Sequence, residues 1–312
     1  MNMNPVIVSA SRRTDIPAFY AKWFANRIKA GYCMVGNNKI MFDNTLMVVF
    51  WTKNPEPMIQ YLNELETRGI DYYFQYTLND YDNRMEKSVP SLSKRIDTFK
   101  RLADMKGSER VIWRYDPIII TEDMDVNEHL RRIENIGNQL KGYTNKLVFS
   151  FFDNYGKATS NMIKAGVCNA RSITQAVPNN TQMNELAKGI GEMAKKWGIK
   201  AATCAEAIDL KAYGIERNRC IGPELIDSIA GPRLKEYMNQ FRNADGKIDM
   251  MKAKDKSQRR LCGCMASYDI GTYNTCLHQC AYCYANMTLD IAMQNRKKHD
   301  VNADSMISFT RI

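Results

Sequence analysis

The chain has 312 residues, 45% hydrophobic and 25% charged, and these ordinary globular proportions exclude a disordered chain and a fibrous repeat. A net charge of +10 would attract nucleic acid or another polyanion, but the basic residues are spread along the sequence. No run of about 18 apolar residues occurs and the first residues lack the order of a signal peptide, so we expect a cytoplasmic protein with no membrane partner.

Several β-rich runs alternate with amphipathic helical stretches along the chain. Strands are predicted at residues 6–11, 46–52, 71–77, 110–116, 146–153 and 200–207. Apolar residues at helical spacing predict helices at 15–31, 58–69, 92–107, 130–140 and 183–197. This alternation predicts an α/β protein, a partial or complete TIM-like βα barrel of parallel strands.

Polar or charged residues follow every one of these strands. The strand ends read SRRTD, TKNP, TLND, RYDP, FDNY and CAEAID. In a barrel of parallel strands the carboxyl ends meet at one mouth, where sites are built. Charged residues also simply begin loops, but six in succession indicate a site at this mouth.

The stretch YNTCLHQCAYCYAN near the end of the chain contains Cys276, Cys280 and Cys283, spaced C-x3-C-x2-C. This spacing is too tight for unstrained disulfides, and it lacks a nearby fourth ligand for a closed zinc site. Three thiolates on one loop can hold three corners of an iron–sulfur cube and leave the fourth iron open. A zinc knuckle or a purely structural cluster is the alternative.

The same spacing, with Tyr282 directly before the last cysteine, resembles the signature of the radical S-adenosylmethionine (SAM) enzymes. The resemblance implies a [4Fe-4S] cluster, SAM bound to its open iron, and an electron donor such as flavodoxin or ferredoxin. It also implies reductive cleavage of SAM to a 5′-deoxyadenosyl radical, which abstracts hydrogen from a substrate.

Two longer likenesses extend beyond this loop. Residues 52–120, from TKNP to WRYDPIII, resemble the middle of spore photoproduct lyase and its relatives. The whole chain, with SASRRTDIPAFY, FWTKNP and WRYDPI, is similar to a microbial family catalogued only as a domain of unknown function. The lyase likeness makes a nucleobase or nucleotide a candidate substrate, while a peptide, a cofactor precursor or a small metabolite stays open.

The position of the cysteine loop departs from the radical SAM pattern, in which the cysteines follow the first barrel strand. Here they follow the Thr-Lys strand by more than 220 residues. Circular permutation explains this order if residues 266–272 form the first strand of the barrel, followed by a helix at 285–296. We therefore divide the chain into βα-barrel units at 1–210, a cysteine-containing insertion at 211–265, and the permuted strand, loop, helix and tail at 266–312.

A second cysteine group comprises Cys204, Cys220, Cys262 and Cys264. Four thiolates could close a second [4Fe-4S] cluster, which we favour, or a structural zinc site. Buried thiols without a ligand are a third interpretation. The remaining two cysteines, Cys33 and Cys168, are expected only to pack.

Several polar residues at strand ends are candidates for binding SAM. Lys53 matches the Thr-Lys position of the lyase relatives, so the resemblance assigns it to the SAM carboxylate. Thr77 and Asn79 could hydrogen-bond the ribose or the carboxylate, and Asp153 completes the mouth.

Arg12, Arg13 and Asp15 offer an anion clamp with an orienting carboxylate, because arginine forks fit carboxylate or phosphate. Alternatively, Asp15 is a helix N-cap. Arg114 and Asp116 flank Tyr115 at a strand end, and these are the candidate catalytic residues.

A non-catalytic zinc or iron–sulfur protein that binds nucleic acid through its basic surface is the competing function. Walker A, G-x-G-x-x-G, H-E-x-x-H and G-x-S-x-G motifs are absent from the sequence. Nucleotide hydrolysis, metalloprotease and serine-hydrolase chemistry therefore have little support.

Overall fold

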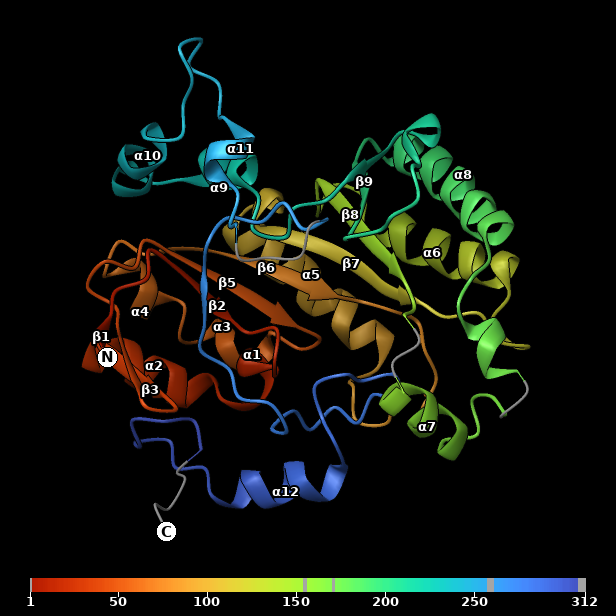
Figure 1. Cartoon of the computed structure of the whole chain (residues 1–312), viewed down its shortest axis with the longest axis horizontal. Coiled ribbons are helices and arrows are strands. Elements are labelled where there is room, and N and C mark those ends of the chain that lie inside the picture. Colours follow the sequence, from red (N-terminus) through yellow and green to blue (C-terminus); the bar gives the residue numbers. More distant parts are fainter. Residues whose placement is uncertain (1, 154–155, 170–171, 257–260, 308–312) are drawn as a thin grey trace. The chain divides into compact units, whose positions relative to one another are not determined.

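The computed structural model of the protein describes residues 2–153, 156–169, 172–256 and 261–307. The chain forms two compact units (Figure 1). The first unit contains Met1–Gln75, Arg219–Leu277 and Ala285–Ile312, and the second contains Tyr76–Asn218 and His278–Tyr284. The predicted segment 1–210 therefore contributes to both units.

Parallel strands form the centre of the first unit: β2 (Ile7–Ala10), β5 (Met47–Thr52) and β11 (Tyr268–Asp269). Strand β2 pairs with β5 on one side and with β11 on the other. All four residues of β2 are buried, as are five of the six in β5, which explains their nearly continuous apolar sequences. The predicted strand near the carboxyl terminus is thus confirmed, although it is shorter than residues 266–272.

The second unit contains four further parallel strands: β7 (Val111–Ile118), β8 (Lys146–Phe151), β9 (Lys200–Thr203) and β10 (Ile215–Arg217). Strand β6 (Asp71–Thr77) begins in the first unit and ends in the second. Hydrogen bonding orders the sheet β10-β9-β8-β7-β6-β5-β2-β11. The predicted parallel α/β sheet is therefore confirmed, and among the described strands its order is open-ended, not a closed ring.

The predicted helix at 15–31 is two helices, α1 (Ile16–Phe19) and α2 (Ala21–Ala30). The carboxylate of Asp15 caps α1 by accepting a hydrogen bond from the Ala18 amide at 2.9 Å, which confirms the N-cap interpretation. Tyr20 breaks the helix with a φ of −132°, and its hydroxyl donates to the Thr275 carbonyl at 2.8 Å. A contact remote in sequence therefore interrupts a locally helical pattern.

The first unit has several elements that the periodicity did not predict. A small sheet orders β1 (Asn2–Met3), β4 (Asn38–Met41) and β3 (Tyr32–Val35). The predicted helix at 58–69 is two short helices, α3 (Glu56–Ile59) and α4 (Asn63–Glu66). Its other helices are α9 (Pro223–Ile229), α10 (Pro232–Asn239), α11 (Met250–Ala253) and α12 (Leu289–Lys297).

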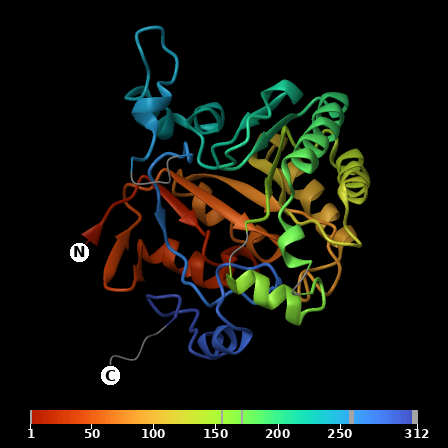
Figure 2. The same ribbon diagram turned by 45° about the vertical axis from the view of Figure 1, so that its right-hand side comes forward.

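Longer helices belong to the second unit. They are α5 (Leu92–Lys106), α6 (Val126–Leu140), α7 (Gly156–Lys164) and α8 (Asn180–Trp197). Three 3₁₀ turns, at Ser108–Arg110, Ile173–Ala176 and Lys211–Tyr213, connect elements of the unit. A capping box at Asn179 begins α8 and Gly198 ends it. Helices α6 and α8 pack side by side (Figure 2).

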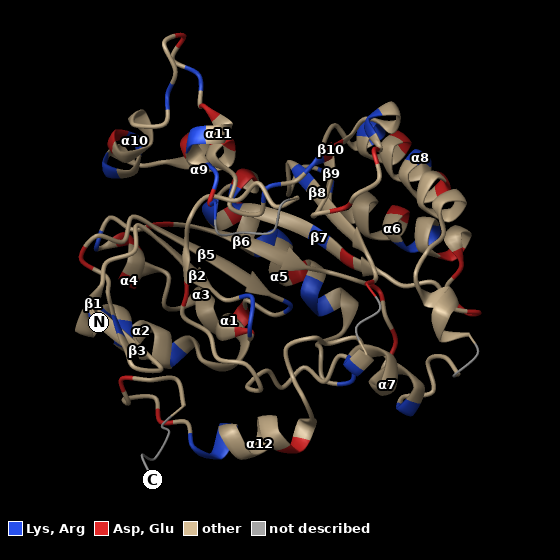
Figure 3. Cartoon of the chain, in the orientation of Figure 1, with Lys and Arg blue, Asp and Glu red and all other residues tan. Residues whose placement is uncertain are grey.

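Charged residues of both signs are interspersed on the helices, for example on α6 and α8 (Figure 3). Among the described residues, no helix is both long enough and apolar enough to span a membrane.

The contact between α6 and α8 makes a specific stability prediction. A Cβ atom on Gly137 would lie 2.2–2.6 Å from the Trp197 ring, whose indole N–H donates to Asn138 at 2.9 Å. Gly137→Ala is therefore expected to lower the free energy of unfolding by about 1–3 kcal/mol, because a rigid ring must move. This loss opposes the gain of about 1 kcal/mol that Ala normally brings to a helix.

Urea unfolding followed by circular dichroism would measure this change. The matched control is Gly156→Ala, because a Cβ there meets nothing within 4 Å. Equal midpoints for the two variants would contradict the close approach of Trp197.

Candidate functional site

The loop that carries Cys276, Cys280 and Cys283 (residues 276–283, hereafter the cysteine loop) is closed at its base. The Asn274 amide donates to the Ala285 carbonyl at 3.1 Å. The Asn286 side-chain amide donates to the Cys276 carbonyl at 2.7 Å, and the Met287 amide donates to the Asn274 side chain at 2.5 Å. The chain thus leaves and returns at one point, with an outer cysteine two residues inside each end.

Within the loop, the backbone turns without regular secondary structure. The Cys283 amide donates to the Cys280 carbonyl at 3.1 Å, which brings these two residues together. Gln279 and Asn274 adopt left-handed backbone conformations, with φ values of 57° and 59°. Such conformations cost free energy in residues other than glycine, so surrounding contacts must hold them.

Tyr282 anchors the loop in the second unit. Its hydroxyl donates to a carboxylate oxygen of Glu86 and accepts a hydrogen bond from the Asn79 side chain at 3.3 Å. The neighbouring Ala281 amide donates to the Met85 carbonyl at 2.9 Å. All of these side chains are buried, so the turn before Cys283 is held by apolar packing and by hydrogen bonds.

A buried ion pair supports Tyr282. The Arg95 guanidinium lies 3.6 Å from Glu86, and both side chains are at most 4% exposed. Burial first, and then the negative charge of Glu86, raise the pKa of Tyr282 well above its ordinary value. Tyr282 therefore stays a neutral hydrogen-bond donor, which is what the carboxylate requires.

Asn79, a predicted SAM ligand, connects this network to the end of β7. Its side-chain oxygen accepts from the Asp116 amide at 2.8 Å and its nitrogen donates to the Asp116 carbonyl at 3.1 Å. Its own carbonyl accepts from Arg95 at 2.9 Å. The structure thus places Asn79 in a fully buried positioning role.

The predicted catalytic residues at the end of β7 face in two directions, as alternation along a strand requires. Arg114 pairs with Asp116 at 2.6 Å, and the Ser150 hydroxyl donates to the other oxygen of Asp116. Tyr115 lies on the opposite face, where its hydroxyl meets His129 Nδ1 at 3.0 Å. Arg114 and Asp116 are therefore together, and Tyr115 is apart from them.

His129 is a buried neutral base. Its Nε2 lies 2.9 Å from the Ile119 carbonyl, which can only accept, so Nε2 carries the proton and Nδ1 accepts from Tyr115. Burial lowers the pKa of His129 to about 4. The Tyr115 hydroxyl is thereby committed to donation within the protein.

Beyond the carboxyl-terminal ends of β2 and β5, Asp15 positions Lys53. One oxygen of the Asp15 carboxylate caps α1, and the other accepts from the Lys53 amide at 2.7 Å. The guanidinium of Arg12 stacks 4.4 Å from the Trp51 ring, and Arg13 lies 4.0 Å from Asp269. Arg12, Arg13, Asp15 and Lys53 thus occupy one end of β2 and β5.

Asp269 is a site residue that the sequence reasoning missed. Its carboxylate accepts from the Ser9 hydroxyl at 2.7 Å, from the Arg12 amide at 2.8 Å and from the Gly271 amide at 2.9 Å. The sequence held a signal for it, because Asp269 lies in residues 266–272, the run predicted as the permuted strand. The other candidate residues likewise lie at strand ends. No predicted strand ends near Glu86, and its signal was only that it begins the Glu-x-x-x-Pro step, Glu86 to Pro90, of the segment that resembles the lyase relatives.

The other predicted ligands are dispersed. Thr77 is half-buried at the end of β6, and Asp153 is exposed after β8. Glu206, which was not among them, lies in the strand end CAEAID beyond β9 and accepts a hydrogen bond from the Phe151 amide at 2.9 Å.

Three members of the second cysteine group, Cys220, Cys262 and Cys264, belong to the first unit. The Ile221 amide donates to the Cys264 sulfur at 3.4 Å. Interaction with Cys264 lowers the pKa of the half-buried Cys262, and interaction with Cys220 and Cys262, together with burial, raises that of Cys264. Cys204 belongs to the second unit, where its amide donates to the Phe149 carbonyl at 3.0 Å.

Arg12 faces the charge of these cysteines. Burial by itself would lower its pKa, but negative charge at Cys220 and Cys264 raises it above the ordinary value. The remaining two thiols pack as expected: Cys33 is buried in β3, and Cys168 is half-buried against an apolar cluster.

The donor chemistry of the cysteine loop fits an iron–sulfur group. Its three thiols are half-buried, so they are neither sealed in the core nor fully hydrated. A base closed by hydrogen bonds confines them to one short segment. Across the part of the chain that the structure describes, no three or more His, Cys, Asp or Glu side chains are already grouped to hold a metal ion.

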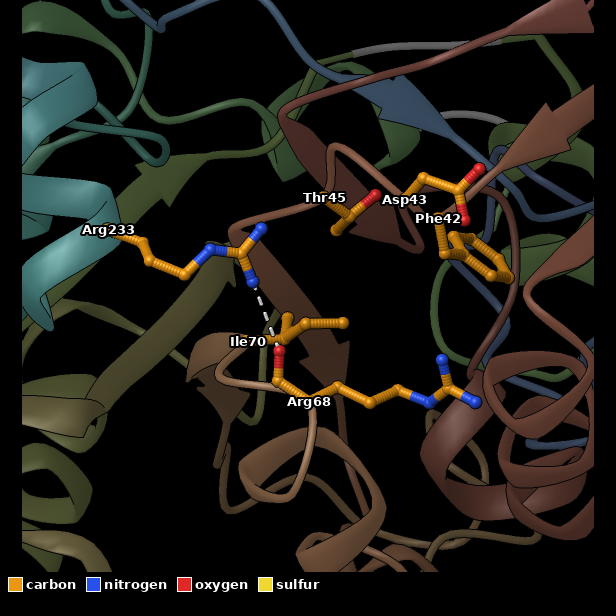
Figure 4. Close-up of a pocket in the computed structure, with 6 residues that line it drawn as sticks. All are labelled: Phe42, Asp43, Thr45, Arg68, Ile70 and Arg233. Carbon is orange, nitrogen blue, oxygen red and sulfur yellow. Dashed lines mark hydrogen bonds between the residues drawn. The ribbon is translucent and has the colours of Figure 1, made fainter.

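A pocket of about 360 Å³ lies elsewhere in the first unit (Figure 4). It is lined by Phe42, Asp43, Thr45, Arg68, Ile70 and Arg233. Arg233 of α10 donates to the Arg68 carbonyl at 3.2 Å. Five of the six lining residues directly precede β5 or β6, so the pocket lies at the opposite end of β5 from Lys53.

The parallel sheet and the helices packed on it define an α/β protein. Residues 7–285 match the family described as a domain of unknown function (DUF1848), so the chain belongs to this family. The predicted full-length likeness to such a family is thereby confirmed. No curated protein matches the sequence.

Similarity to solved structures is weak. A xylose isomerase-like TIM barrel/4-hydroxyphenylpyruvate dioxygenase fusion protein has a TM-score of 0.34 at 10% identity, covering 93% of this chain and 41% of its own. Dihydropyrimidinase from Brevibacillus agri NCHU1002 has a TM-score of 0.30 at 8% identity, covering 80% and 53%. L-Hydantoinase (dihydropyrimidinase) from Arthrobacter aurescens has a TM-score of 0.27 at 10% identity, covering 76% and 44%. At these scores the likeness transfers no reaction.

The buried histidine predicts a pH-dependent stability. Below pH 6.5 the unfolded chain binds a proton at His129, whereas the folded chain does not until about pH 4. Stability is therefore lost as the pH falls through this window, by about 2 kcal/mol at pH 5 from this group alone. The free energy of unfolding of the wild type and of His129→Gln, each at pH 7 and pH 5, would measure it.

The wild type is expected to lose more stability than His129→Gln between these pH values. The difference between the two free energies of unfolding should therefore be smaller at pH 5 than at pH 7. The other two histidines are common to both proteins and cancel in the comparison. A gap that stays constant or widens at pH 5 would show that His129 is protonated in the folded state.

The anchor of the cysteine loop predicts a second stability effect. Tyr282→Phe keeps the ring but removes the hydroxyl that donates to Glu86. The free energy of unfolding should fall by about 1–3 kcal/mol, because a buried carboxylate loses a donor. Tyr273→Phe is the matched control, since that tyrosine is half-exposed and its ring still faces Arg13. An equal effect in both variants would refute the anchoring role.

Proposed function

We propose that this chain is a radical SAM enzyme in which Cys276, Cys280 and Cys283 ligate a [4Fe-4S] cluster. The observation that supports it most is the loop itself: three half-buried thiols on one segment, closed at the base by the Asn274–Ala285 hydrogen bond of 3.1 Å. A cluster with one open iron and bound SAM supplies, once reduced, a carbon radical that takes hydrogen from a substrate.

The protein's own contribution begins with holding the loop and keeping water from it. Ala281 and Tyr282 pack in an apolar cluster with Tyr81 and Met85, and Cys280 packs against the same cluster. The Glu86–Tyr282 hydrogen bond fixes the turn from behind. One side of the cysteine turn is thus dry, as a site that handles a reactive radical requires.

We assign the binding of SAM to Lys53, Thr77, Arg12 and Arg13, on the resemblance and on their side-chain chemistry. The backbone of Lys53 is fixed by Asp15, whose carboxylate accepts from its amide at 2.7 Å. Asn79 acts by positioning, through its bonds to Asp116 and Tyr282. Asp153, which is exposed, is assigned to the rim.

Substrate contact is assigned to Arg114 and Asp116, while Tyr115, whose hydroxyl bonds to His129 on the other face of β7, is assigned to packing. The Asp116 side chain is 22% exposed while that of Arg114 is 5% exposed, so the carboxylate is the accessible partner. A polar substrate such as a nucleotide or nucleobase suits an arginine–carboxylate pair. Delivery of electrons would come from a protein such as flavodoxin or ferredoxin, in the cytoplasm.

Circular permutation of the barrel is part of the proposal. Strand β11, directly before the cysteine loop, pairs in parallel with β2 at Tyr268–Val8 and Asp269–Ser9. This edge position beside the amino-terminal strand is the one that the first barrel strand of the superfamily would take. This pairing supports a circularly permuted barrel, in which the strand nearest the carboxyl terminus takes the first place in the strand order.

Anaerobic reconstitution with iron and sulfide tests the proposal. The wild type is expected to become brown, to show the paramagnetic resonance of a reduced [4Fe-4S] cluster that changes on addition of SAM, and to release 5′-deoxyadenosine after reduction. Cys280→Ser should lose the SAM-responsive signal and the product, because one cluster ligand is removed.

Cys33→Ala is the control, since Cys33 is buried in β3, outside the apolar cluster that holds the cysteine loop, and its loss should leave the product yield unchanged. Reconstituted wild-type protein that yields no 5′-deoxyadenosine would defeat the enzymatic proposal. Colourless protein with zinc at the loop, and nucleic-acid affinity falling steeply with salt, would favour the binding-protein alternative.

A further inference from the structure

The pocket of about 360 Å³ lies wholly within the first unit, and its lining includes none of the residues assigned to the cluster or to SAM. Three separate segments form its walls: the turn before β5, the turn before β6 and the first turn of α10. Pockets that hold small organic ligands have volumes of about 300–1,000 Å³. The pocket is therefore large enough for a second ligand.

Hydrogen bonds fix these three segments. The Asp71 amide, at the start of β6, donates to the Leu46 carbonyl at 2.9 Å, and the Asp71 carboxylate accepts from the Gly231 amide at 2.7 Å. Since Gly231 is the N-cap of α10, the first turn of this helix is tied to the start of β6. The Thr45 hydroxyl donates to the Pro5 carbonyl at 2.9 Å, which fixes the turn before β5. The walls of the pocket are thus connected to one another and to the sheet.

Each of the two arginines in the pocket is positioned by a backbone carbonyl. Nη2 of Arg68 donates to the Lys29 carbonyl at 2.8 Å, and Nη1 of Arg233 donates to the Arg68 carbonyl at 3.2 Å (Figure 4). In the part of the chain that the structure describes, no carboxylate forms an ion pair with either guanidinium. A guanidinium has five N–H donors, so each arginine keeps several that a ligand can use.

Two guanidinium groups that have no carboxylate partner make the pocket a site for an anion. Their planar forks match the oxygens of phosphate and carboxylate. A phosphomonoester carries a charge of about −1.5 to −2 at pH 7 and three acceptor oxygens, which matches two positive charges. A carboxylate has one charge and two oxygens, which a single arginine satisfies. The pair of arginines therefore favours phosphate.

The other lining residues suit a ligand that is larger than inorganic phosphate. Asp43 is exposed, and its carboxylate would repel a bare phosphate but accept a hydrogen bond from a ligand hydroxyl. Phe42 and Ile70, each 4% exposed, give the pocket an apolar wall that a carbon skeleton can contact. A phosphate joined to a hydroxylated carbon chain satisfies both features.

We propose that this pocket binds a small phosphomonoester that carries hydroxyl groups, with Arg68 and Arg233 on the phosphate and Asp43 on a hydroxyl. The site lies at the opposite end of β5 from Lys53, so its ligand would not compete with one bound there. The inference does not rest on the proposed radical chemistry, because it uses none of the residues assigned to the cluster or to SAM.

Isothermal titration calorimetry of the full-length protein at fixed salt tests the site, with glycerol 3-phosphate, inorganic phosphate and succinate as probes. Glycerol 3-phosphate is expected to bind most tightly and succinate most weakly. Arg68→Gln and Arg233→Gln should each weaken the binding of glycerol 3-phosphate about 10-fold or more, because each removes charged hydrogen bonds. Asp43→Asn should reduce the difference in affinity between the two phosphates, because it removes both the repulsion and the hydroxyl acceptor.

The matched control is Arg131→Gln, an exposed arginine of α6 that pairs with Glu128 and should leave the affinity unchanged. The three pocket side chains to be replaced are exposed, so the variants should fold, which circular dichroism would verify. Unchanged affinity in both pocket arginine variants, or an equal loss in Arg131→Gln, would overturn the proposal. So would succinate that binds as tightly as glycerol 3-phosphate, or no binding of either phosphate. The yield of 5′-deoxyadenosine bears on none of these outcomes.

Discussion

One buried hydrogen bond, from the Tyr282 hydroxyl to the Glu86 carboxylate, fixes the turn of the cysteine loop before Cys283. The carboxylate is offset by Arg95, which lies 3.6 Å away, and Tyr282 stays neutral because its pKa is raised. Since Tyr282 directly precedes Cys283, fixing the ring also fixes the backbone from which that thiol projects. A charge that is costly to bury is thus used to hold a loop that has no regular secondary structure.

Each unit uses an acidic side chain in this way. In the first unit, Asp269 gathers the Ser9 hydroxyl and the amides of Arg12 and Gly271 at the end of β11. Carboxylates that accept several such bonds organise the loops around them, so they act by positioning rather than by contact with a ligand. Some of the polar residues at the strand ends therefore serve to hold their neighbours in place.

The two cysteine groups have different environments. The thiols of the cysteine loop are half-buried on a loop closed at its base by hydrogen bonds. Cys220 and Cys264 are buried, and the Cys264 sulfur accepts a hydrogen bond from the Ile221 amide at 3.4 Å. Burial therefore separates the two groups, although both consist of the same residue type.

The sequence by itself predicted the parallel strands, because a continuous apolar run such as residues 46–52 indicates a strand that is covered on both faces. The spacing of Cys276, Cys280 and Cys283 also located the three-cysteine loop. Only tertiary structure decided that the helix predicted at 15–31 breaks at Tyr20, which reaches Thr275, and that Glu86 supports Tyr282. Periodicity reports the local environment of a segment, whereas these contacts join residues 196 and 255 positions apart, and no local pattern encodes them.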